Sequence, residues 1–492
     1  MKFSPKETLS KEEIRSGLRT VIKDGLTSQA MVTLTMGVFL VAFALKLGAS
    51  NAVVGLLAAI PFLAQLVQIP AIYLVEKVRN RKLISVYSLT VARLFWLLIG
   101  LIPFLFSVKV GLVALTIALL VRSSLVAVGS TSWNSWMRDL VPKDQLGSFF
   151  SKRMSLATAL GIPLSLVAAF YLDYWKKAFP AFELYGYSVL FFSGCLIGLF
   201  GIRYISMIPE PRMVQVNEKT KFVRLLLQPF KNENFKNLII FLGSWNFAVN
   251  LAVPFFTVYM LKRLKLEMSF IIALSVVSQL MSLAFFRVWG RFSDRFSNKS
   301  VLRVSGPLFI GCILAWTFTT MPERYSFTMP LLVTIHILTG ISAAGVALAS
   351  GNIGLKLAPR GQATAFLSTI SLINSLAAGI GSILGGRFAD FFAKGELSWT
   401  MRWTGPQGEF AFQTLNLQQW DFFFLLAFLI GLYSIHRLVL VKEVGEVKER
   451  VIIQELFSEI GRTTRNLSTI WGLRYVIRLP LSFTKKTLRR KK

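Results

Sequence analysis

The sequence predicts an all-α polytopic membrane protein whose 12 transmembrane helices form two parallel six-helix halves. Three observations lead to this prediction: the composition is strongly apolar, the charged residues lie between long apolar segments, and the second half of the chain repeats motifs of the first. Of the 492 residues, 54% are hydrophobic and 16% are charged, whereas a soluble protein is about a quarter charged. A soluble fold of this size could not bury so much apolar surface.

Twelve apolar segments are long enough to cross a bilayer, which takes roughly 20 residues in a helix. Several of them contain internal prolines, which neighbouring helices of a bundle tolerate. The segments lie at about residues 26–47, 53–75, 83–106, 109–133, 150–173, 187–208, 236–261, 267–289, 300–320, 328–352, 360–392 and 419–441.

These segments divide the chain into five regions. The regions are a cytoplasmic N-terminal segment (1–25), an N-terminal six-helix half (26–208), a cytoplasmic linker (209–235), a C-terminal six-helix half (236–441) and a basic cytoplasmic tail (442–492). The side of the termini carries 38 of the 55 Lys and Arg residues, and the opposite side carries 10. Because basic residues concentrate in cytoplasmic loops, both termini are expected in the cytoplasm. Without an apolar signal segment at its start, the protein is expected in the plasma membrane, the inner membrane of a bacterium.

An internal repeat relates the two halves. LVPKDQLGSFFS (Leu140–Ser151) aligns with LAPRGQATAFLS (Leu357–Ser368) at an offset of 217 residues. EKVRNR (Glu76–Arg81) aligns with DRFSNK (Asp294–Lys299) at nearly the same offset. Since the paired loops follow corresponding spans, the two halves are predicted to be parallel repeats related by an axis along the membrane normal.

At these loops the sequence resembles the major facilitator superfamily, over about residues 26–441. The family's motif after the second span of a half is Gly-x-x-x-Asp-Arg-x-x-x-Lys/Arg. The C-terminal half meets it in full, at Gly290, Asp294, Arg295 and Lys299. The N-terminal half keeps the final base and replaces the other three residues, at Ile72, Glu76, Lys77 and Arg81.

The resemblance implies that these loops form a cytoplasmic latch, closed when the cavity faces outward and broken when it faces inward. Asp294 would contact the start of the fifth span (Phe150–Arg153), and Glu76 the start of the eleventh (Arg360–Ala365). A helix N-terminus attracts a carboxylate because its backbone N–H groups are unpaired and its dipole is positive there. Gly290 would let two helices approach closely. The alternative is an ordinary positively charged cytoplasmic turn.

Arg93 and Arg122 lie near the middle of predicted spans, where a charge costs roughly 3 kcal/mol or more unless it faces a cavity or a partner. No Asp or Glu lies at comparable depth in a predicted span, so neither arginine has an evident carboxylate partner. Arg122 also resembles the family's membrane-embedded arginine of the fourth span. We therefore expect a wet cavity in which these arginines contact an anionic or zwitterionic solute. The alternative is that backbone carbonyls or polar side chains satisfy them.

The resemblance implies that the first, fourth, seventh and tenth spans line the transport route. The seventh span offers Asn246 and Asn250, which are four residues apart and share a helix face. The tenth offers His336, which could titrate near neutral pH and carry a proton. Both asparagines serve equally well as packing hydrogen bonds between helices, and the histidine as a structural residue.

Other functions lack their motifs. The 2 Cys and 2 His residues supply no disulfide framework and no metal motif. GIGSILGG (Gly379–Gly386) has neither the spacing nor the preceding strand of a dinucleotide fingerprint, and Walker A, GxSxG and HExxH motifs are missing. Its small residues are instead spaced for close helix packing. The net charge of +31 lies between apolar segments rather than on a polar domain. No enzyme activity, metal, cofactor or nucleic-acid partner is therefore expected.

The sequence predicts a secondary transporter of a small polar or anionic organic solute, which works by rocking of the halves about a midplane site. One alternative is an exporter of amphiphilic compounds or drugs, and another is a membrane sensor or scaffold without transport. Coupling to a proton or an ion stays open. A monomer is expected, with the basic tail, including Thr469–Phe483, against anionic lipids of the inner leaflet.

Overall fold

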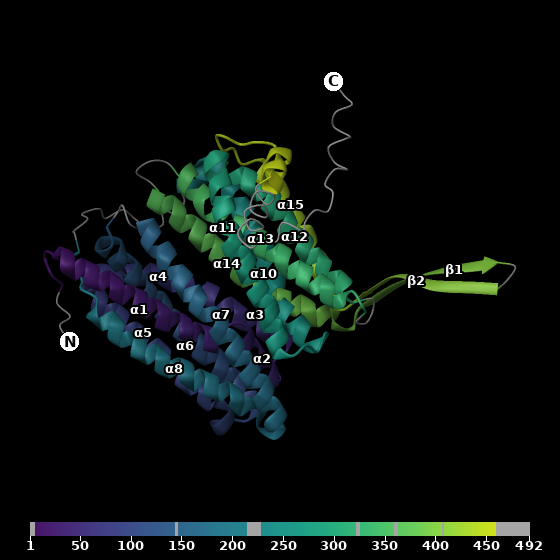
Figure 1. Cartoon of the computed structure of the whole chain (residues 1–492), viewed down its shortest axis with the longest axis horizontal. Helices are drawn as coiled ribbons and strands as arrows, with labels where there is room; N and C mark the ends of the chain where they lie inside the picture. Colours follow the sequence, from purple (N-terminus) through teal and green to yellow (C-terminus); the bar gives the residue numbers. More distant parts are fainter. Residues whose placement is uncertain are drawn as a thin grey trace, which may run out of the picture.

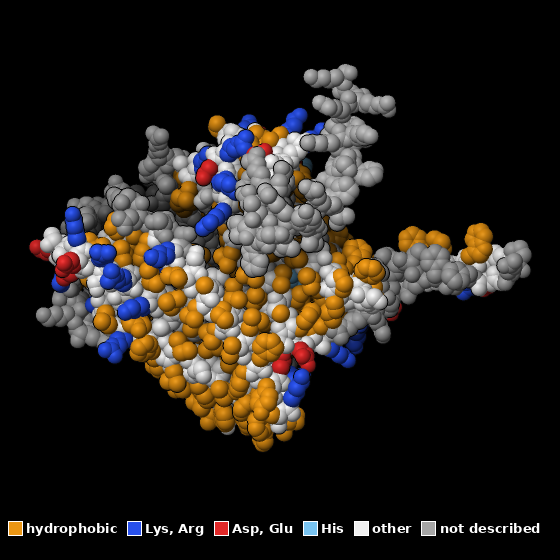
Figure 2. Space-filling view, viewed as in Figure 1, with side chains coloured by type: hydrophobic (Ala, Val, Ile, Leu, Met, Phe, Trp, Pro, Cys, Tyr) orange, Lys and Arg blue, Asp and Glu red, His pale blue; other side chains and the backbone are white. Residues whose placement is uncertain are grey.

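The computed structural model describes residues 5–142, 146–213, 228–320, 325–358, 363–405 and 408–458. Within these ranges it contains 12 helices that are long and apolar enough to span a membrane. Figure 1 shows the two halves side by side, the N-terminal half in purple and blue and the C-terminal half in teal and green. Apolar side chains cover the flank of the bundle, and Lys and Arg gather towards its ends (Figure 2). The predicted twelve-span bundle is confirmed.

Eight helices form the six spans of the N-terminal half, because the first two spans are each built from two helices. They are α1 (Lys11–Thr35), α2 (Val38–Lys46), α3 (Asn51–Leu63), α4 (Gln68–Val78), α5 (Arg81–Leu105), α6 (Val108–Leu140), α7 (Leu146–Ala178) and α8 (Glu183–Met207). Six helices form the C-terminal half. They are α10 (Glu233–Lys262), α11 (Met268–Arg295), α12 (Asn298–Ala315), α13 (Thr328–Leu357), α14 (Ala363–Phe391) and α15 (Trp420–Val439).

The first span departs from the prediction at its start and in its middle. α1 begins at Lys11, where Ser10 and Glu13 form a capping box, so the helix starts well before residue 26. It ends at Thr35, and α2 starts at Val38 after Gly37, whose φ of 63° suits a residue without a side chain. Residues predicted to lie in a cytoplasmic segment, Asp24 among them, therefore belong to the first helix of the bundle.

The break predicted between the last two spans contains a β-hairpin. β1 (Glu396–Gly405) pairs antiparallel with β2 (Gly408–Gln418), from Glu396 opposite Gln418 to Gly405 opposite Gly408. The hairpin projects from one end of the bundle (Figure 1). We call this the hairpin end, and the opposite end, where α1 begins, the N-terminal end. The alternating apolar and polar residues of ELSWTMRW are the strand signal that the sequence analysis passed over.

The two halves are joined at the hairpin end by two equivalent contacts. Asp390 on α14 accepts hydrogen bonds from the backbone N–H groups of Asn51 and Ala52, at 3.1 and 2.8 Å, where α3 starts. Asp173 on α7 accepts hydrogen bonds from Met268 and Ser269, at 3.1 and 2.8 Å, where α11 starts. Each residue of one contact lies 217 positions from its counterpart in the other. The repeat found in the loops thus extends to the seam between the halves.

Glycines let α3 and α14 pack closely beside the Asp390 contact. A Cβ on Gly55 would collide with the carbonyl oxygen of Ser382, and a Cβ on Gly386 with that of Asn51. The other row of small residues on α14 faces α10, where a Cβ on Gly381 would overlap the carbonyl oxygen of Phe247. The spacing of small residues in GIGSILGG therefore serves helix packing, as predicted.

Gly386→Leu is expected to lower the stability of the bundle, because overpacking a close helix contact costs about 1–3 kcal/mol. Thermal unfolding of the purified protein should show the loss. Gly311→Leu is the matched control, since Gly311 lies on α12, is exposed, and has nothing within 4 Å of an added Cβ. Equal melting temperatures for the two variants would contradict the close packing of α3 against α14.

Candidate functional site

A cavity of about 350 Å³ lies inside the N-terminal half. Its lining comes from α1, α5, α6, α7 and α8, and no described residue of the C-terminal half is among its lining residues. Three arginines and one aspartate are its charged lining residues, so we call it the arginine cavity. The side chains that matter for its chemistry are Asp24, Ser28, Arg93, Arg122, Trp133 and Arg153.

Arg93 has a carboxylate partner, which corrects the sequence analysis. Its Nη2 lies 3.5 Å from Oδ1 of Asp24 and donates a hydrogen bond of 2.9 Å to Oγ of Ser28. Its Nη1 donates to the carbonyl oxygen of Gly198 on α8. The prediction failed because Asp24 was placed in the segment before the first span, whereas α1 carries it into the bundle. Arg93 is largely satisfied by protein groups.

Asp24 lies between two guanidinium groups. It is 3% exposed, and Nη2 of Arg153 lies 3.6 Å from its second carboxylate oxygen. Ser28 donates a further hydrogen bond of 3.1 Å to it. The single negative charge of Asp24 is therefore shared between the positive charges of Arg93 and Arg153.

Arg122 differs from the other two arginines. It is 5% exposed, and none of its nitrogen atoms is hydrogen-bonded to any residue described by the structure; its Nε is completely buried. The guanidinium carbon lies 4.5 Å from the ring centroid of Trp96, a cation–π contact. Nε1 of Trp133, another cavity residue, is likewise buried without a described partner. The cavity thus holds an unpaired cation and an unpaired N–H donor.

A second hollow, which we call the apolar cavity, lies between the halves and has a volume of about 360 Å³. It is bounded by the break between α1 and α2 at Met36 and Gly37, by α2, α3 and α6 of the N-terminal half, and by α10 of the C-terminal half. The polar side chains of its lining are Ser123, Asn250 and Thr257. Ser123 directly follows Arg122 on α6, so consecutive residues of that helix line the two cavities.

Of the C-terminal candidates, Asn250 alone lines either of these two cavities. Its amide donates to the carbonyl oxygen of Asn246 at 2.9 Å, and the amide of Asn246 donates to that of Leu242 at 2.8 Å. His336 is buried inside the C-terminal half, with Nδ1 2.8 Å from the carbonyl oxygen of Leu332 and its ring against Trp316. The structure thus brings Arg93 and Arg122 together and leaves Asn246 and His336 outside both cavities.

The ends of the two motif loops are anchored by glutamates that follow the last span of each half. Glu210 accepts backbone hydrogen bonds from Arg81 and Lys82 at the start of α5, at 2.7 and 3.1 Å. Glu443 accepts backbone hydrogen bonds from Asn298 and Lys299 at the start of α12, at 3.3 and 2.7 Å.

The side chains of the two motif bases are buried in these anchors. The guanidinium group of Arg81 is fully buried and pairs with Glu210 and Asp139. The Lys299 side chain is 3% exposed and pairs with Glu446.

The structure aligns the two loops one residue differently from the sequence analysis. The N-cap residues Asn80 and Ser297 lie 217 positions apart, so Lys82, and not Arg81, takes the place of Lys299. The atom nearest to a Cβ on Gly290 would be Leu348 Cδ1 at 3.8 Å, an ordinary contact, so the predicted close helix approach at Gly290 is wrong for this structure.

The motif residues at the N-terminal end face solvent. Asp294, Glu76 and Lys77 are exposed, and the Asp294 carboxylate forms no hydrogen bond or ion pair with a described residue. Arg295 pairs with Glu455 at 2.7 Å. The latch between halves stays a prediction, and part of its second target, residues 359–362, lies outside the described residues, as do residues 214–227 of the linker and 459–492 of the tail.

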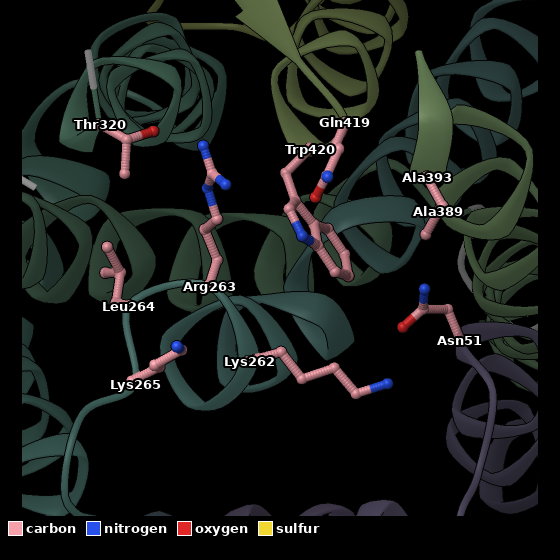
Figure 3. Close-up of a pocket in the computed structure, with 10 residues that line it drawn as sticks. All are labelled: Asn51, Lys262, Arg263, Leu264, Lys265, Thr320, Ala389, Ala393, Gln419 and Trp420. Atoms are coloured by element: carbon pink, nitrogen blue, oxygen red, sulfur yellow. The ribbon is translucent and has the colours of Figure 1, made fainter. Parts of the chain in front are cut away.

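A third hollow, of about 530 Å³, opens at the hairpin end (Figure 3). Lys262, Arg263 and Lys265 at the end of α10 give it a basic character, and Arg263 donates to Gln418 at 3.0 Å. In Figure 3 the amine of Lys262 extends toward Asn51, whose Oδ1 is buried without a described partner. This basic pocket adjoins the Asp390 contact between the halves.

Comparison with known proteins agrees with this architecture. The family model of the Major Facilitator Superfamily matches residues 25–382, and the chain therefore belongs to this superfamily. No curated protein sequence matches the chain.

Solved structures of transporters share the fold. A mutant of the nucleoside transporter NupG has a TM-score of 0.64 at 13% identity, over 87% of this chain and 100% of that one. A bacterial homologue of the iron transporter ferroportin in its inward-facing state has a TM-score of 0.57 at 13% identity, over 89% and 100%. A bacterial homologue of the human lysosomal transporter Spinster has a TM-score of 0.55 at 15% identity, over 78% and 84%.

Glu210→Gln is expected to destabilise the N-terminal half strongly, because removing one charge of a buried pair costs about 3–5 kcal/mol. Glu7→Gln is the matched control, since its ion pair with Arg212 is exposed and such a pair contributes about 1 kcal/mol or less. Thermal unfolding of both purified variants tests the difference. A Glu210→Gln protein that melts with wild type would rule out a structural role for the anchor.

Proposed function

We propose that the protein is a secondary transporter that moves a small organic solute across the plasma membrane by alternating access, and that Arg122 contacts an anionic group of this solute. The observation that carries the proposal is the unpaired, buried guanidinium of Arg122 beside a cavity in a two-half membrane bundle. A membrane-embedded charge without a partner costs several kcal/mol, so its retention is best explained by a ligand of opposite charge.

The proposed cycle uses the two ends of the bundle as alternate gates. The hairpin end is assigned to the outside and the N-terminal end to the cytoplasm, in line with the distribution of basic residues. The Asp173 and Asp390 contacts then close the outer gate in this conformation. Asp294, exposed here, is free to form the cytoplasmic latch when the bundle opens outward. Rocking of the halves exchanges these contacts.

Neighbouring features complete the proposal. Asp24 and His336 are buried titratable groups that offer places for a coupling proton. The partner of the transporter is the solute itself. We propose that the transporter acts as a monomer without a cofactor. Its basic tail is proposed to lie on anionic lipids. Family membership and transporter neighbours support transport over catalysis.

Two alternative functions are kept open. The apolar cavity favours a transporter of amphiphilic compounds within the same class. A membrane sensor without transport would bind a ligand at Arg122 and move none.

Arg122→Gln is expected to reduce transport at least tenfold, because it removes the charge and keeps a side chain of similar length. Proteoliposomes are exposed to a mixture of labelled anionic, zwitterionic, neutral and cationic organic solutes, and the accumulated compounds are measured by mass spectrometry. Arg203→Gln, at an exposed position outside the cavity, should transport normally. Binding without accumulation of any solute would favour the sensor, and uptake unaffected by Arg122→Gln would refute the proposed contact.

The proposed outer gate can be tested by measuring how fast a cysteine in the apolar cavity reacts with a reagent added from outside. Cys195 and Cys312 are buried, so a Thr257→Cys reporter in the apolar cavity can be labelled by a membrane-impermeant maleimide from outside. Asp173→Asn with Asp390→Asn should raise the labelling rate several-fold, because each charge-assisted hydrogen bond contributes about 1.5–3 kcal/mol to the closed gate. Asp294→Ala should lower the rate by weakening the outward-open state.

Glu183→Gln is the control for this experiment. Glu183 lies at the same end and pairs with Lys46 at 2.7 Å inside one half, so its loss should leave the labelling rate unchanged. A double Asp→Asn variant that labels at the wild-type rate would show that these carboxylates do not close the gate.

A further inference from the structure

We propose that the arginine cavity and the apolar cavity together form one binding site for a single-chain or ring-containing amphiphilic anion. The anionic head would occupy the arginine cavity and the apolar body would occupy the space between the halves. This inference rests on the proposed function and narrows its substrate class, joining the two transporter alternatives that the sequence left open.

The charges of its lining residues identify the arginine cavity as the site of the anionic head. Arg93, Arg122 and Arg153 face the arginine cavity with Asp24 as its one acidic lining residue, an excess of two positive charges. Asp24 contacts Arg93 and Arg153, which leaves Arg122 as the group without a protein anion. Burying an unpaired charge is costly, so a ligand that brings one or two negative charges is strongly favoured there. The unpaired Nε1 of Trp133 adds a neutral donor to the head site.

The aliphatic lining of the apolar cavity identifies it as the site of the apolar body, because burial there is favoured by the hydrophobic effect. The apolar cavity is lined mainly by aliphatic residues of both halves, such as Leu57 and Leu119 on one side and Val253 on the other. The amide of Asn250, its most polar lining residue, already donates to its own helix. A hydrocarbon or aromatic body would be transferred from water into this space with a gain of about 0.8 kcal/mol per buried methylene group.

The two sites share the helix α6 and are both next to a smaller hollow. On α6, Arg122 and Val126 line the arginine cavity, while Leu119 and Ser123 line the apolar cavity. Val32 on α1 lines the arginine cavity, Met36 just after the end of α1 lines the apolar one, and a smaller hollow of about 220 Å³ is lined by both residues. Gly37, where the first span breaks, lines both this smaller hollow and the apolar cavity. One elongated ligand can therefore reach both sites.

The volumes limit the size of this ligand. Each cavity is near the lower limit of the 300–1,000 Å³ typical of small-molecule sites. A small charged head and one short chain or ring system fit, whereas a two-chain phospholipid exceeds this space. The assigned ligand is accordingly a dissolved compound and not a bilayer lipid.

The binding of three probe compounds measures the contributions of the head site and the body site separately. Wild-type protein in nanodiscs of zwitterionic lipid is titrated with octanoate, with its neutral amide and with acetate, and empty discs are subtracted. Octanoate should bind at least tenfold tighter than the amide, because of its charge, and at least tenfold tighter than acetate, because each buried methylene group strengthens binding about fourfold. Acetate binding as tightly as octanoate would overturn the body site.

Two variants assign these differences to the two cavities. Arg122→Gln should remove the preference for octanoate over the amide and leave amide binding unchanged. Ala58→Phe, which fills the apolar cavity, should remove the preference for octanoate over acetate. Arg203→Gln, outside both cavities, should bind like wild type. Variants that change neither preference would place the ligand elsewhere and refute the joined site.

The outcome separates this inference from the proposed function. If short polar anions are transported in an Arg122-dependent way while chain length has no effect on binding, the transporter proposal stands and the amphiphile assignment fails. Repeating the titration in nanodiscs that contain an anionic phospholipid should leave octanoate affinity unchanged. Loss of octanoate binding in those discs would identify a bilayer lipid as the occupant and overturn the assignment to a dissolved compound.

Discussion

Four carboxylates that accept hydrogen bonds from the starts of other helices determine how this bundle is held together. Glu210 and Glu443 hold the starts of α5 and α12 at the N-terminal end. Asp173 and Asp390 hold the starts of α11 and α3 at the hairpin end. The first N–H groups of a helix have no partner within it, and in a membrane protein water reaches few of them. A carboxylate satisfies two of these groups at once and also matches the positive end of the helix dipole.

The two pairs of contacts differ in what they join. Glu210 and Glu443 each connect parts of one half, and both are buried. Asp173 and Asp390 connect one half to the other. Loss of a Glu contact would loosen a half, whereas loss of an Asp contact would weaken the seam between the halves. Under the proposed function, this division would let each half stay rigid while the hairpin end opens, as alternating access requires.

The bundle and its repeat could be predicted from sequence, but the composition of the site could be predicted only in part. Twelve apolar segments and the 217-residue offset depend on composition and local motifs, which the sequence displays directly. Asp24 was missed because a hydropathy boundary marks where apolar residues begin, not where the helix begins. Arg122 was found because a lone charge inside an apolar segment is conspicuous. Whether such a charge is paired depends on tertiary contacts. These contacts pair Arg93 with Asp24 and leave Arg122 unpaired.

The difference between the two motif loops has a physical explanation in their anchors. In the N-terminal half, Arg81 at the start of α5 pairs with Asp139 near the end of α6. The positions 217 residues later hold Asn298 and Lys356, and Lys356 pairs with Glu443 at 3.0 Å. Each half thus supplies one cation to its buried glutamate, from α5 in one half and from α13 in the other.

Both motif bases are buried and form ion pairs near their own anchors, Arg81 with Glu210 and Lys299 with Glu446. The C-terminal loop has Lys299 as a separate buried base and leaves Asp294 exposed. The sequence identified the C-terminal loop as the intact copy of the motif. The structure leaves Glu76 exposed as well as Asp294. The two loops therefore differ in which cation meets the buried glutamate, Arg81 of the loop itself in one half and Lys356 of α13 in the other, and not in whether a carboxylate is exposed.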